Sequence, residues 1–313
     1  MIVRDGLEAV PAGRRAIAIG SFDGVHLGHR RVIAATVEAA AGDRLTAALV
    51  TFQPHPMRVL RPQEAPPELS SLERRAELAA RLGPDELVVI RFTPELSRVS
   101  AEEFGGRIVA RALGAQRVFV GENFRYGHRA QGTTATLAAQ GAHLGFAVEV
   151  VPMVEVDGSA VSSSRIRALV AAGEVEAASR LLGRPAWVEG TVVRGDGRGR
   201  QIGVPTANLG LSAVALRPGT GIYAGRVHLA GEKHPAAISV GSNPTFSDDG
   251  EAIRVEAHLL DFDRDIYGAP VLVEFTHRLR DELRFDSVQE LVDQIGRDIA
   301  RTRELAAIPA PGR

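Results

Sequence analysis

The stretch Gly20-Ser21-Phe22-Asp23-Gly24-Val25-His26-Leu27-Gly28-His29 decides the fold of the first half of the chain. It follows a short apolar run at 16–19, typical of a buried strand, and precedes a helical pattern at 30–41. Its glycines let the backbone approach a ligand closely, and the helix start offers free N–H groups to an anion. His26 and His29 are three residues apart, so we expect them to point the same way, where two imidazoles can donate to phosphate oxygens.

Strand and helix patterns alternate from this stretch to residue 183. Apolar strand-like runs at 45–52, 86–92, 117–120 and 146–151 are separated by helical patterns. Ser70-x-x-Glu73 and Ser100-x-x-Glu103 are capping boxes, which predict the starts of two of these helices. The alternation indicates an α/β domain with a mostly parallel sheet covered by helices, and such sheets bind ligands beyond the carboxyl ends of their strands.

Three more polar segments fall where ligands are expected. Thr51–Pro56 follows the second strand run, Gly121–Gly127 follows the fourth, and Val161–Arg167 combines a serine cluster with two arginines at the start of a late helix. Taken singly, the four segments have other interpretations. Gly20–His29 also fits a turn with two solvated histidines, or a histidine metal pair with no third ligand nearby in sequence. Val161–Arg167 also fits a serine N-cap beside a solvated arginine face. Their convergence on one end of the predicted sheet favours a polyphosphate site.

The pattern changes after residue 184. Strand-like runs at 187–193, 222–229, 236–240, 253–259 and 271–279 are separated by turns rich in glycine and proline, and an amphipathic helix is expected at 287–305. This arrangement predicts a small antiparallel β-barrel with a closing helix. We therefore expect two domains, residues 1–183 and residues 184–313.

A glycine-rich loop at 194–205 leads into Thr206-Ala207-Asn208. A flexible arginine–glycine loop and an RNA-binding stretch are alternative interpretations, although no aromatic residues are interleaved. A phosphate cradle fits better, because the Thr206 hydroxyl and the Asn208 amide are hard oxygen donors suited to magnesium (Mg²⁺). Glu256 shares one strand face with Arg254 and His258, so it is a candidate general base; a salt bridge with Arg254 is the alternative.

Composition excludes several classes of function. The chain has 313 residues and no cysteine, which excludes disulfides, thiol nucleophiles and iron–sulfur clusters. Lys233 is the only lysine and is followed by His234, so no Walker A motif exists. The net charge of −1 predicts no bulk attraction to nucleic acid or to an anionic membrane. With no apolar run of about 18 residues and no signal-peptide pattern at the N-terminus, we expect a cytoplasmic protein.

Taken together, these motifs resemble a known family. Gly20–His29 and Val161–Arg167 are similar to the two signatures of the nucleotidylyltransferase superfamily. With Thr51–Pro56 and Gly121–Gly127, they resemble the adenylyltransferase module of bacterial bifunctional riboflavin kinase/FMN adenylyltransferases (FAD synthetases). The segment around Pro205–Asn208 resembles the flavokinase motif. The resemblance implies a Rossmann-like first domain, a barrel of flavokinase type, and small-molecule substrates: ATP, riboflavin and FMN, with FAD as product.

The resemblance also implies roles for individual residues. His26, His29 and Arg167 would stabilise charge during adenylylation, and Glu256 would take the proton of the riboflavin 5′-hydroxyl. Thr206 and Asn208 would hold Mg²⁺. The substrate-binding residues implied in the two domains are Gly20, Phe22, Asp23, Gly24, Gly28, His55, Asn123, Arg125, Ser163, Ser164, Gly197, Arg198, Gly199, Arg200, Gly203 and Asn243.

Two other functions stay open at this point. The first domain could adenylylate a different mononucleotide, but the barrel motif and Glu256 would then have no role. The chain could also be a flavin or nucleotide sensor without turnover, against which the paired histidines and Glu256 argue. The sequence leaves the oligomeric state undecided.

Overall fold

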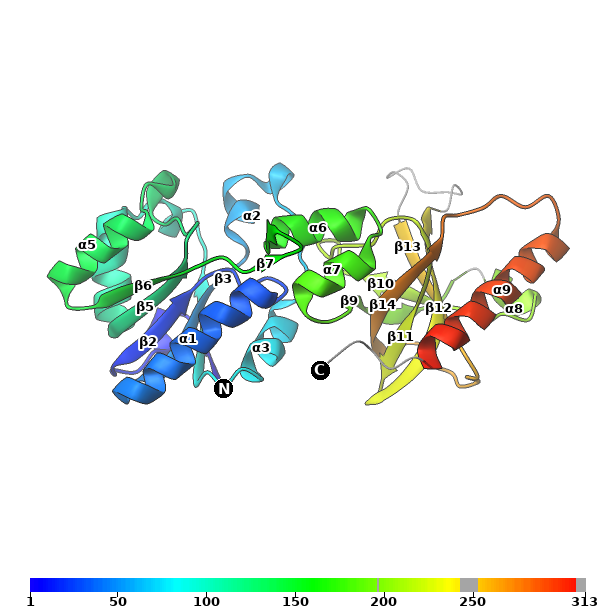
Figure 1. The fold of residues 1–313 in the computed structure, drawn as a ribbon, viewed down its shortest axis with the longest axis horizontal. Coiled ribbons are helices and arrows are strands. Elements are labelled where there is room, and N and C mark those ends of the chain that lie inside the picture. The colour runs from blue at the N-terminus through cyan, green and yellow to red at the C-terminus, as the bar shows by residue number, and fades with distance from the viewer. Residues whose placement is uncertain (196, 243–252, 308–313) are drawn as a thin grey trace. The chain divides into compact units, whose positions relative to one another are not determined.

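The computed structural model describes residues 1–195, 197–242 and 253–307 (Figure 1). Contacts divide the chain into two compact units: Met1–Pro66 with Ser71–Ser163, and Pro67–Ser70 with Ser164–Arg313. The predicted domain limits of 1–183 and 184–313 stay a prediction, because no finding tests them.

The first unit is built on a parallel six-stranded sheet with the order β1-β4-β3-β2-β5-β6. Its main helices are α1 and α5, and a π-helix at Phe104–Ala112 continues the short α4. The elements of this unit are β1 (Ile2–Asp5), β2 (Arg15–Ile19), α1 (Leu27–Asp43), β3 (Thr46–Gln53), α2 (Pro56–Leu60), α3 (Leu72–Ala80), β4 (Glu86–Arg91), α4 (Ala101–Glu103), β5 (Ala115–Gly121), α5 (Thr134–Leu144), β6 (Ala147–Val151), β7 (Glu155–Val156) and β8 (Ser159–Ala160).

Strand β2 lies in the middle of this sheet and is buried along its whole length. It pairs with β3 on one side and with β5 on the other, both in parallel. The chain moves outward from β2 through β3 and β4 and then returns to β5, so the strand order reverses beside β2. A crevice at such a reversal is where open α/β sheets bind ligands. The predicted parallel sheet is confirmed.

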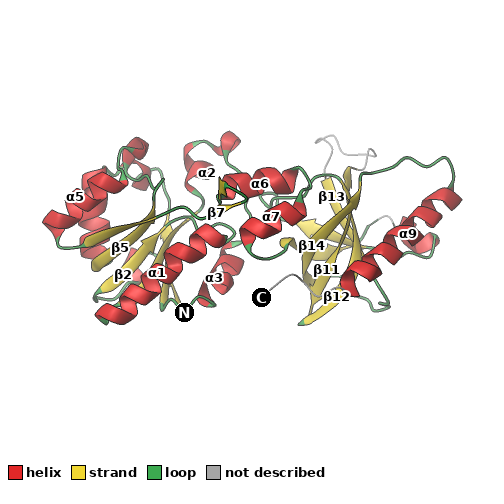
Figure 2. Ribbon diagram, in the orientation of Figure 1, coloured by secondary structure: helices red, strands yellow, loops and turns green. Residues whose placement is uncertain are grey.

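The second unit is a closed antiparallel barrel with the strand order β10-β13-β12-β11-β14-β9 (Figure 2). Its core contains Tyr223, Ile238, Val273 and Phe275, all fully buried. The elements of this unit are α6 (Ser163–Ala171), which begins at the last residue of the first unit, α7 (Val175–Leu182), β9 (Ala186–Val193), α8 (Arg198–Gln201), β10 (Ala207–Leu211), β11 (Gly221–Leu229), β12 (Glu232–Ser242), β13 (Ile253–Leu259), β14 (Pro270–Arg280) and α9 (Val288–Ala307).

Helix α9 closes the chain against β11 and β12, as the amphipathic pattern predicts. Arg280 at the end of β14 fixes it, because its Nη2 lies 2.7 Å from Oδ2 of the largely buried Asp298. The predicted barrel and closing helix are therefore confirmed.

Two details differ from the sequence-based expectation. The cap of α3 is Ser71, whose side chain accepts a hydrogen bond from the Arg74 N–H, so the capping box predicted at Ser70 is wrong by one residue. Strands β1, β7, β8 and β10 were not expected. β1 has only four residues and two charges, β7 and β8 have two residues each, and β10 contains a glycine and begins at Ala207, inside the segment predicted as a binding loop.

Candidate functional sites in the two units

The first candidate site is the loop between β2 and α1. Phe22 and Val25 have φ values of 48° and 40°, although neither is a glycine. Both side chains are buried, at 2% and 1% exposure, so their packing holds the loop in a conformation that costs backbone strain. Strained backbone held by its surroundings is typical of functional loops. Between these two residues lies Asp23, which is fully buried.

His26 is the N-cap of α1, and this fixes the hydrogen-bonding state of its ring. Its Nδ1 accepts a hydrogen bond of 3.3 Å from the backbone N–H of His29. In the neutral ring the proton must then sit on Nε2, which becomes a donor. The rings of His26 and His29 stack with their centroids 3.6 Å apart, and Phe22 packs edge-on against His29 at 5.4 Å. The two imidazoles therefore form a stacked pair at the start of α1.

In the loop after β3, a second histidine caps the start of a helix. His55 is the N-cap of α2, and its Nδ1 accepts from the Met57 N–H at 3.3 Å, so in the neutral ring the proton again sits on Nε2. The Thr51 hydroxyl donates to the carbonyl oxygen of Ser21 at 3.0 Å. The hydrogen bond joins the end of β3 to the loop after β2.

The loop after β5 carries Asn123 and Arg125, both exposed. Arg125 Nη1 donates to the carbonyl of Phe124 at 3.1 Å, and the Phe124 ring stacks on Tyr126 with the centroids 5.7 Å apart. Tyr126 is buried, and burial raises the pKa of its phenol. The stacked pair of Phe124 and the buried Tyr126 holds the loop against the core, while the Asn123 side chain is exposed.

The fourth predicted segment reaches the first site through Ser163. Its Oγ donates to the carbonyl oxygen of Asp23 at 3.2 Å. Ser164 and Arg167 belong to the second unit, where Arg167 Nε donates to the carbonyl of Pro67 at 2.7 Å. The assignment of Ser164 and Arg167 to the first site stays a prediction.

The second candidate site lies where β10 meets β13 in the barrel. Asn208 pairs directly with Glu256 in the antiparallel register, and the Thr206 hydroxyl donates to Glu256 Oε2 at 3.0 Å. Val255 and Ala257 point into the barrel core, so Glu256 points to the outer face, in agreement with the alternation read from the sequence. His258 Nδ1 lies 2.8 Å from the carbonyl oxygen of Pro205 and ties the same loop to β13.

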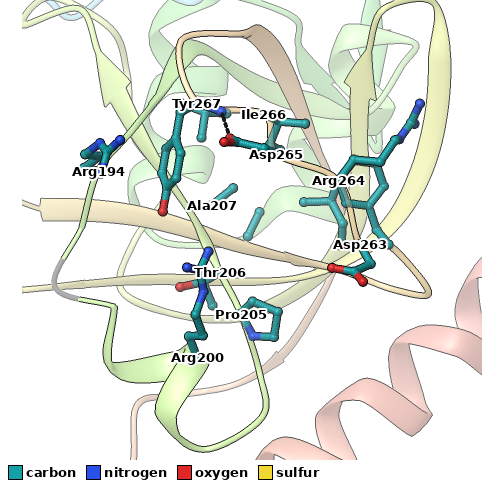
Figure 3. Close-up of a pocket in the computed structure, with 14 residues that line it drawn as sticks. Arg194, Arg200, Pro205, Thr206, Ala207, Asp263, Arg264, Asp265, Ile266 and Tyr267 are labelled. Carbon is teal, nitrogen blue, oxygen red and sulfur yellow. Dashed lines mark hydrogen bonds between the residues drawn. The ribbon is translucent and has the colours of Figure 1, made fainter.

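A cavity of about 630 Å³ adjoins this cluster (Figure 3). Tyr267 and Arg200 reach toward Thr206 from opposite sides, and the Arg194 guanidinium lies 5.1 Å from the centre of the Tyr267 ring. The full lining consists of Val192, Arg194, Arg200, Pro205, Thr206, Ala207, Ala257, Leu259, Phe262, Asp263, Arg264, Asp265, Ile266 and Tyr267.

Of the predicted site residues, Arg200 and Thr206 line this cavity. Asn208 and Glu256 are not part of its wall. Glu256 accepts a hydrogen bond from the wall residue Thr206, and Asn208 pairs with Glu256 in the neighbouring strand. Gly197 and Gly203 take left-handed backbone angles, with φ of 70° and 79°. Gly199 accepts from the Val204 N–H, and the one-turn helix α8 begins at Arg198. Asn243 lies outside the described residues.

The barrel cluster fits a magnesium ion by the chemistry of its donors. The Thr206 hydroxyl, the Asn208 amide oxygen and the Glu256 carboxylate are hard oxygen ligands, the class that Mg²⁺ prefers. Within the described residues there is no group of three or more His, Asp or Glu side chains that could hold a metal ion. Any divalent ion here would therefore share its coordination with a substrate's phosphates, as is common for Mg²⁺.

Sequence reasoning missed several residues around these sites. Asp263, Asp265 and Tyr267 line the cavity, but their stretch of sequence predicts only a turn, because Ile266 stands where a calcium loop needs a glycine. Arg194 was known only as part of the glycine-rich loop. Arg75 was not singled out at all, because an arginine beside Arg74 in a helix suggests a solvated face.

No helix within the described ranges is long and apolar enough to cross a membrane.

The family model described as FAD synthetase matches residues 10–165, and the one described as riboflavin kinase matches residues 182–306.

Two curated relatives share the name bifunctional riboflavin kinase/FMN adenylyltransferase. The protein of Pseudomonas fluorescens is 39% identical over 95% of both chains, and that of Listeria monocytogenes is 38% identical over 94% of this chain and 93% of its own. A solved structure, named a macrolide-efflux protein from Streptococcus pneumoniae, superposes with a TM-score of 0.87 at 34% identity. It covers 97% of this chain and 99% of its own.

Proposed function

The chain belongs to the family of bifunctional riboflavin kinase/FMN adenylyltransferases, and from this premise we propose how its residues divide the two reactions. It phosphorylates riboflavin to FMN with ATP, and it adenylylates FMN to FAD with a second ATP. Its substrates are thus small molecules. We assign the phosphorylation to the barrel and the adenylylation to the first unit, and we place both reactions in the cytoplasm, where ATP is supplied, without a nucleic-acid or membrane partner.

In the barrel, Glu256 acts as the general base. Its carboxylate accepts the proton of the riboflavin 5′-hydroxyl, whose oxygen attacks the γ-phosphorus of ATP, and ADP leaves. Arg200, at the cavity wall, and the backbone of the glycine-rich loop hold the phosphates. Thr206 and Asn208 would hold Mg²⁺, which when bound offsets the negative charge of the phosphates.

In the first unit, a phosphate oxygen of FMN attacks the α-phosphorus of ATP, and pyrophosphate leaves. His26 and His55 would donate to the phosphates through Nε2–H, because backbone N–H groups donate to their Nδ1 atoms. His29 stacks on His26 and adds a second donor at the same helix start, where the dipole favours negative charge. Ser163 adds a hydroxyl to the triphosphate site, and Asn123 contacts the flavin or the nucleotide. The assignment of Ser164 and Arg167 to the same site rests on the sequence motif alone. No covalent enzyme intermediate is required.

The hydrogen bond from Thr206 to Glu256 carries the assignment of the kinase, because it joins a candidate base to the wall of a cavity large enough for a ligand. The test is incubation with riboflavin, ATP and Mg²⁺, followed by chromatographic separation of the flavins. We expect FMN first and FAD later. Supplying FMN in place of riboflavin tests the first unit alone, and FAD must then form without the kinase reaction. The proposal is wrong if riboflavin yields no FMN, or if supplied FMN yields no FAD.

A further inference from the structure

We propose that Arg75 of α3 is a positioning residue for adenylylation, which sets the loop that carries His26 and His29 by holding the buried side chain of Asp23. The inference rests on the proposed function of the first site. Arg75 is 2% exposed and Asp23 is fully buried, so neither side chain is placed to meet solvent. Arg75 acts through the protein and not on the substrate.

The contact between α3 and the loop is an ion pair. Arg75 Nη2 lies 3.7 Å from Asp23 Oδ1, within reach of a charge interaction. The other terminal nitrogen of Arg75, Nη1, donates to the Thr51 hydroxyl at 3.5 Å, and Thr51 in turn donates to the carbonyl of Ser21 at 3.0 Å. One guanidinium thus approaches the loop at two points, directly at Asp23 and through Thr51 at Ser21. Its planar fork suits such a double task.

The loop needs such a restraint because its backbone is strained on both sides of Asp23. Phe22 and Val25 occupy the left-handed region, which residues with a Cβ adopt only where the surroundings enforce it. Immediately after Val25 comes His26, whose ring caps α1. A release of this strain would rotate the peptide that leads into His26 and would move the imidazole pair.

Asp23 also joins the loop to the fourth motif. Its carbonyl oxygen accepts from Ser163 Oγ at 3.2 Å, while its carboxylate meets Arg75. A shift of Asp23 therefore disturbs both the histidine loop and the serine that begins α6. The effect falls on charge stabilisation in the transition state, so the loss is expected mainly in kcat, with little change in the KM of ATP or FMN.

The experiment uses the full chain and compares three variants. Arg75→Met removes the charge with similar length, Arg75→Lys restores the charge, and Arg81→Met makes the same change at an exposed arginine after the end of α3. We expect the kcat of FAD formation from FMN to fall about 10- to 100-fold in Arg75→Met and to stay unchanged in Arg81→Met. In Arg75→Lys we expect kcat to recover only in part, because a single ammonium restores the charge but not the two separate contacts with Asp23 and Thr51. Riboflavin phosphorylation in the same samples should be unaffected.

Parent-like kcat in a folded Arg75→Met protein overturns the inference. A buried carboxylate without its cation can also unfold the first unit, which circular dichroism and a melting curve would reveal. The variant Asp23→Asn/Arg75→Met then decides, because it removes both buried charges together and relieves that cost. If Arg75 positions the loop, this folded variant keeps the low kcat. If its kcat returns to the parent value, Arg75 serves only to neutralise Asp23 and the inference fails.

His29→Ala separates this inference from the proposed function. Loss of FAD formation in His29→Ala together with a fully active Arg75→Met would uphold the site and reject the role of Arg75. Full activity in His29→Ala would reject the proposed site itself, whatever Arg75 does.

Discussion

The Thr206 hydroxyl donates a hydrogen bond of 3.0 Å to Oε2 of Glu256, across the junction of β10 and β13. The contact orients the carboxylate and places it next to a residue of the cavity wall. In the proposed kinase reaction, the other carboxylate oxygen accepts the proton of the substrate. We therefore expect Glu256→Gln, which keeps the shape and can still accept from Thr206, to lower FMN formation about 100-fold or more.

The same protein supplies the control for Glu256→Gln. FAD formation from added FMN should proceed at the parent rate, because the first unit folds around its own core. Both rates are measured by chromatography of the flavins. FMN formation at the parent rate in this variant would exclude Glu256 as the base.

His29→Ala should have the opposite effect. It removes one of two stacked imidazoles beside the start of α1, and with it a donor toward the phosphates. Loss of one such donor typically lowers kcat by about 100- to 1,000-fold. We expect that loss in FAD formation from FMN, measured by steady-state kinetics, with riboflavin phosphorylation unchanged. Loss of both activities in a folded variant would contradict the assignment of separate sites.

Gly28→Ala should impair adenylylation by displacing His26. A Cβ at Gly28 would lie 3.1 Å from Cε1 and 3.2 Å from Nδ1 of the His26 ring, closer than ordinary contact, so the ring must shift. We expect kcat for FAD formation to fall about 10-fold. Gly42→Ala is the matched control, because it lies in the same helix with nothing within 4 Å of the added Cβ. Equal effects of the two substitutions would point to helix stability and not to the ring.

Acid should lower the stability of the first unit by protonating Glu86. Burial alone raises the pKa of this carboxyl, but hydrogen bonds and charges from Arg15 and Arg4 outweigh it and hold the pKa below its ordinary value of 4.5. A lowered folded-state pKa contributes stability above pH 4.5, and this contribution is lost as the pH falls through the folded-state value. Glu86→Gln leaves the buried Arg15 without its carboxylate, and loss of one partner of a buried ion pair typically costs about 3–5 kcal/mol of the free energy of unfolding. Because the pKa of Glu86 is lowered, the difference from the parent should narrow below pH 4.5.

Urea unfolding of the parent and Glu86→Gln proteins at several pH values measures this difference. Glu149→Gln is the control, because its ion pair with Arg117 is half exposed and should contribute less than about 1 kcal/mol. A Glu86→Gln difference that stays constant from pH 7 to pH 3 would show that the paired charge is not its source.

Sequence reasoning predicted both folds, because the periodicity of the apolar runs matches the observed strands and helices. The site residues stay a prediction, and their motifs lie at the ends of strands. Sequence reasoning reached less where tertiary packing overrides local pattern. Arg75 belongs to a helix stretch with Arg74 nearby, and only the tertiary structure reveals that one of them is buried against Asp23. β10 was hidden because Thr206-Ala207-Asn208 was interpreted as a binding loop, whereas its last two residues begin a barrel strand. Tyr267 reaches the cavity through loop geometry that no periodicity records.

Closure of the barrel has a consequence for solubility at high concentration. Because β10 pairs with both β13 and β9, the ring of strands leaves no backbone edge open to a second molecule. The open sheet of the first unit instead ends at β1 and β6, and each of these outer strands carries charge, Arg4 and Asp5 on one and Glu149 on the other. Charged outer strands discourage strand-to-strand aggregation, so both open edges of this sheet are protected by charge where the barrel is protected by closure.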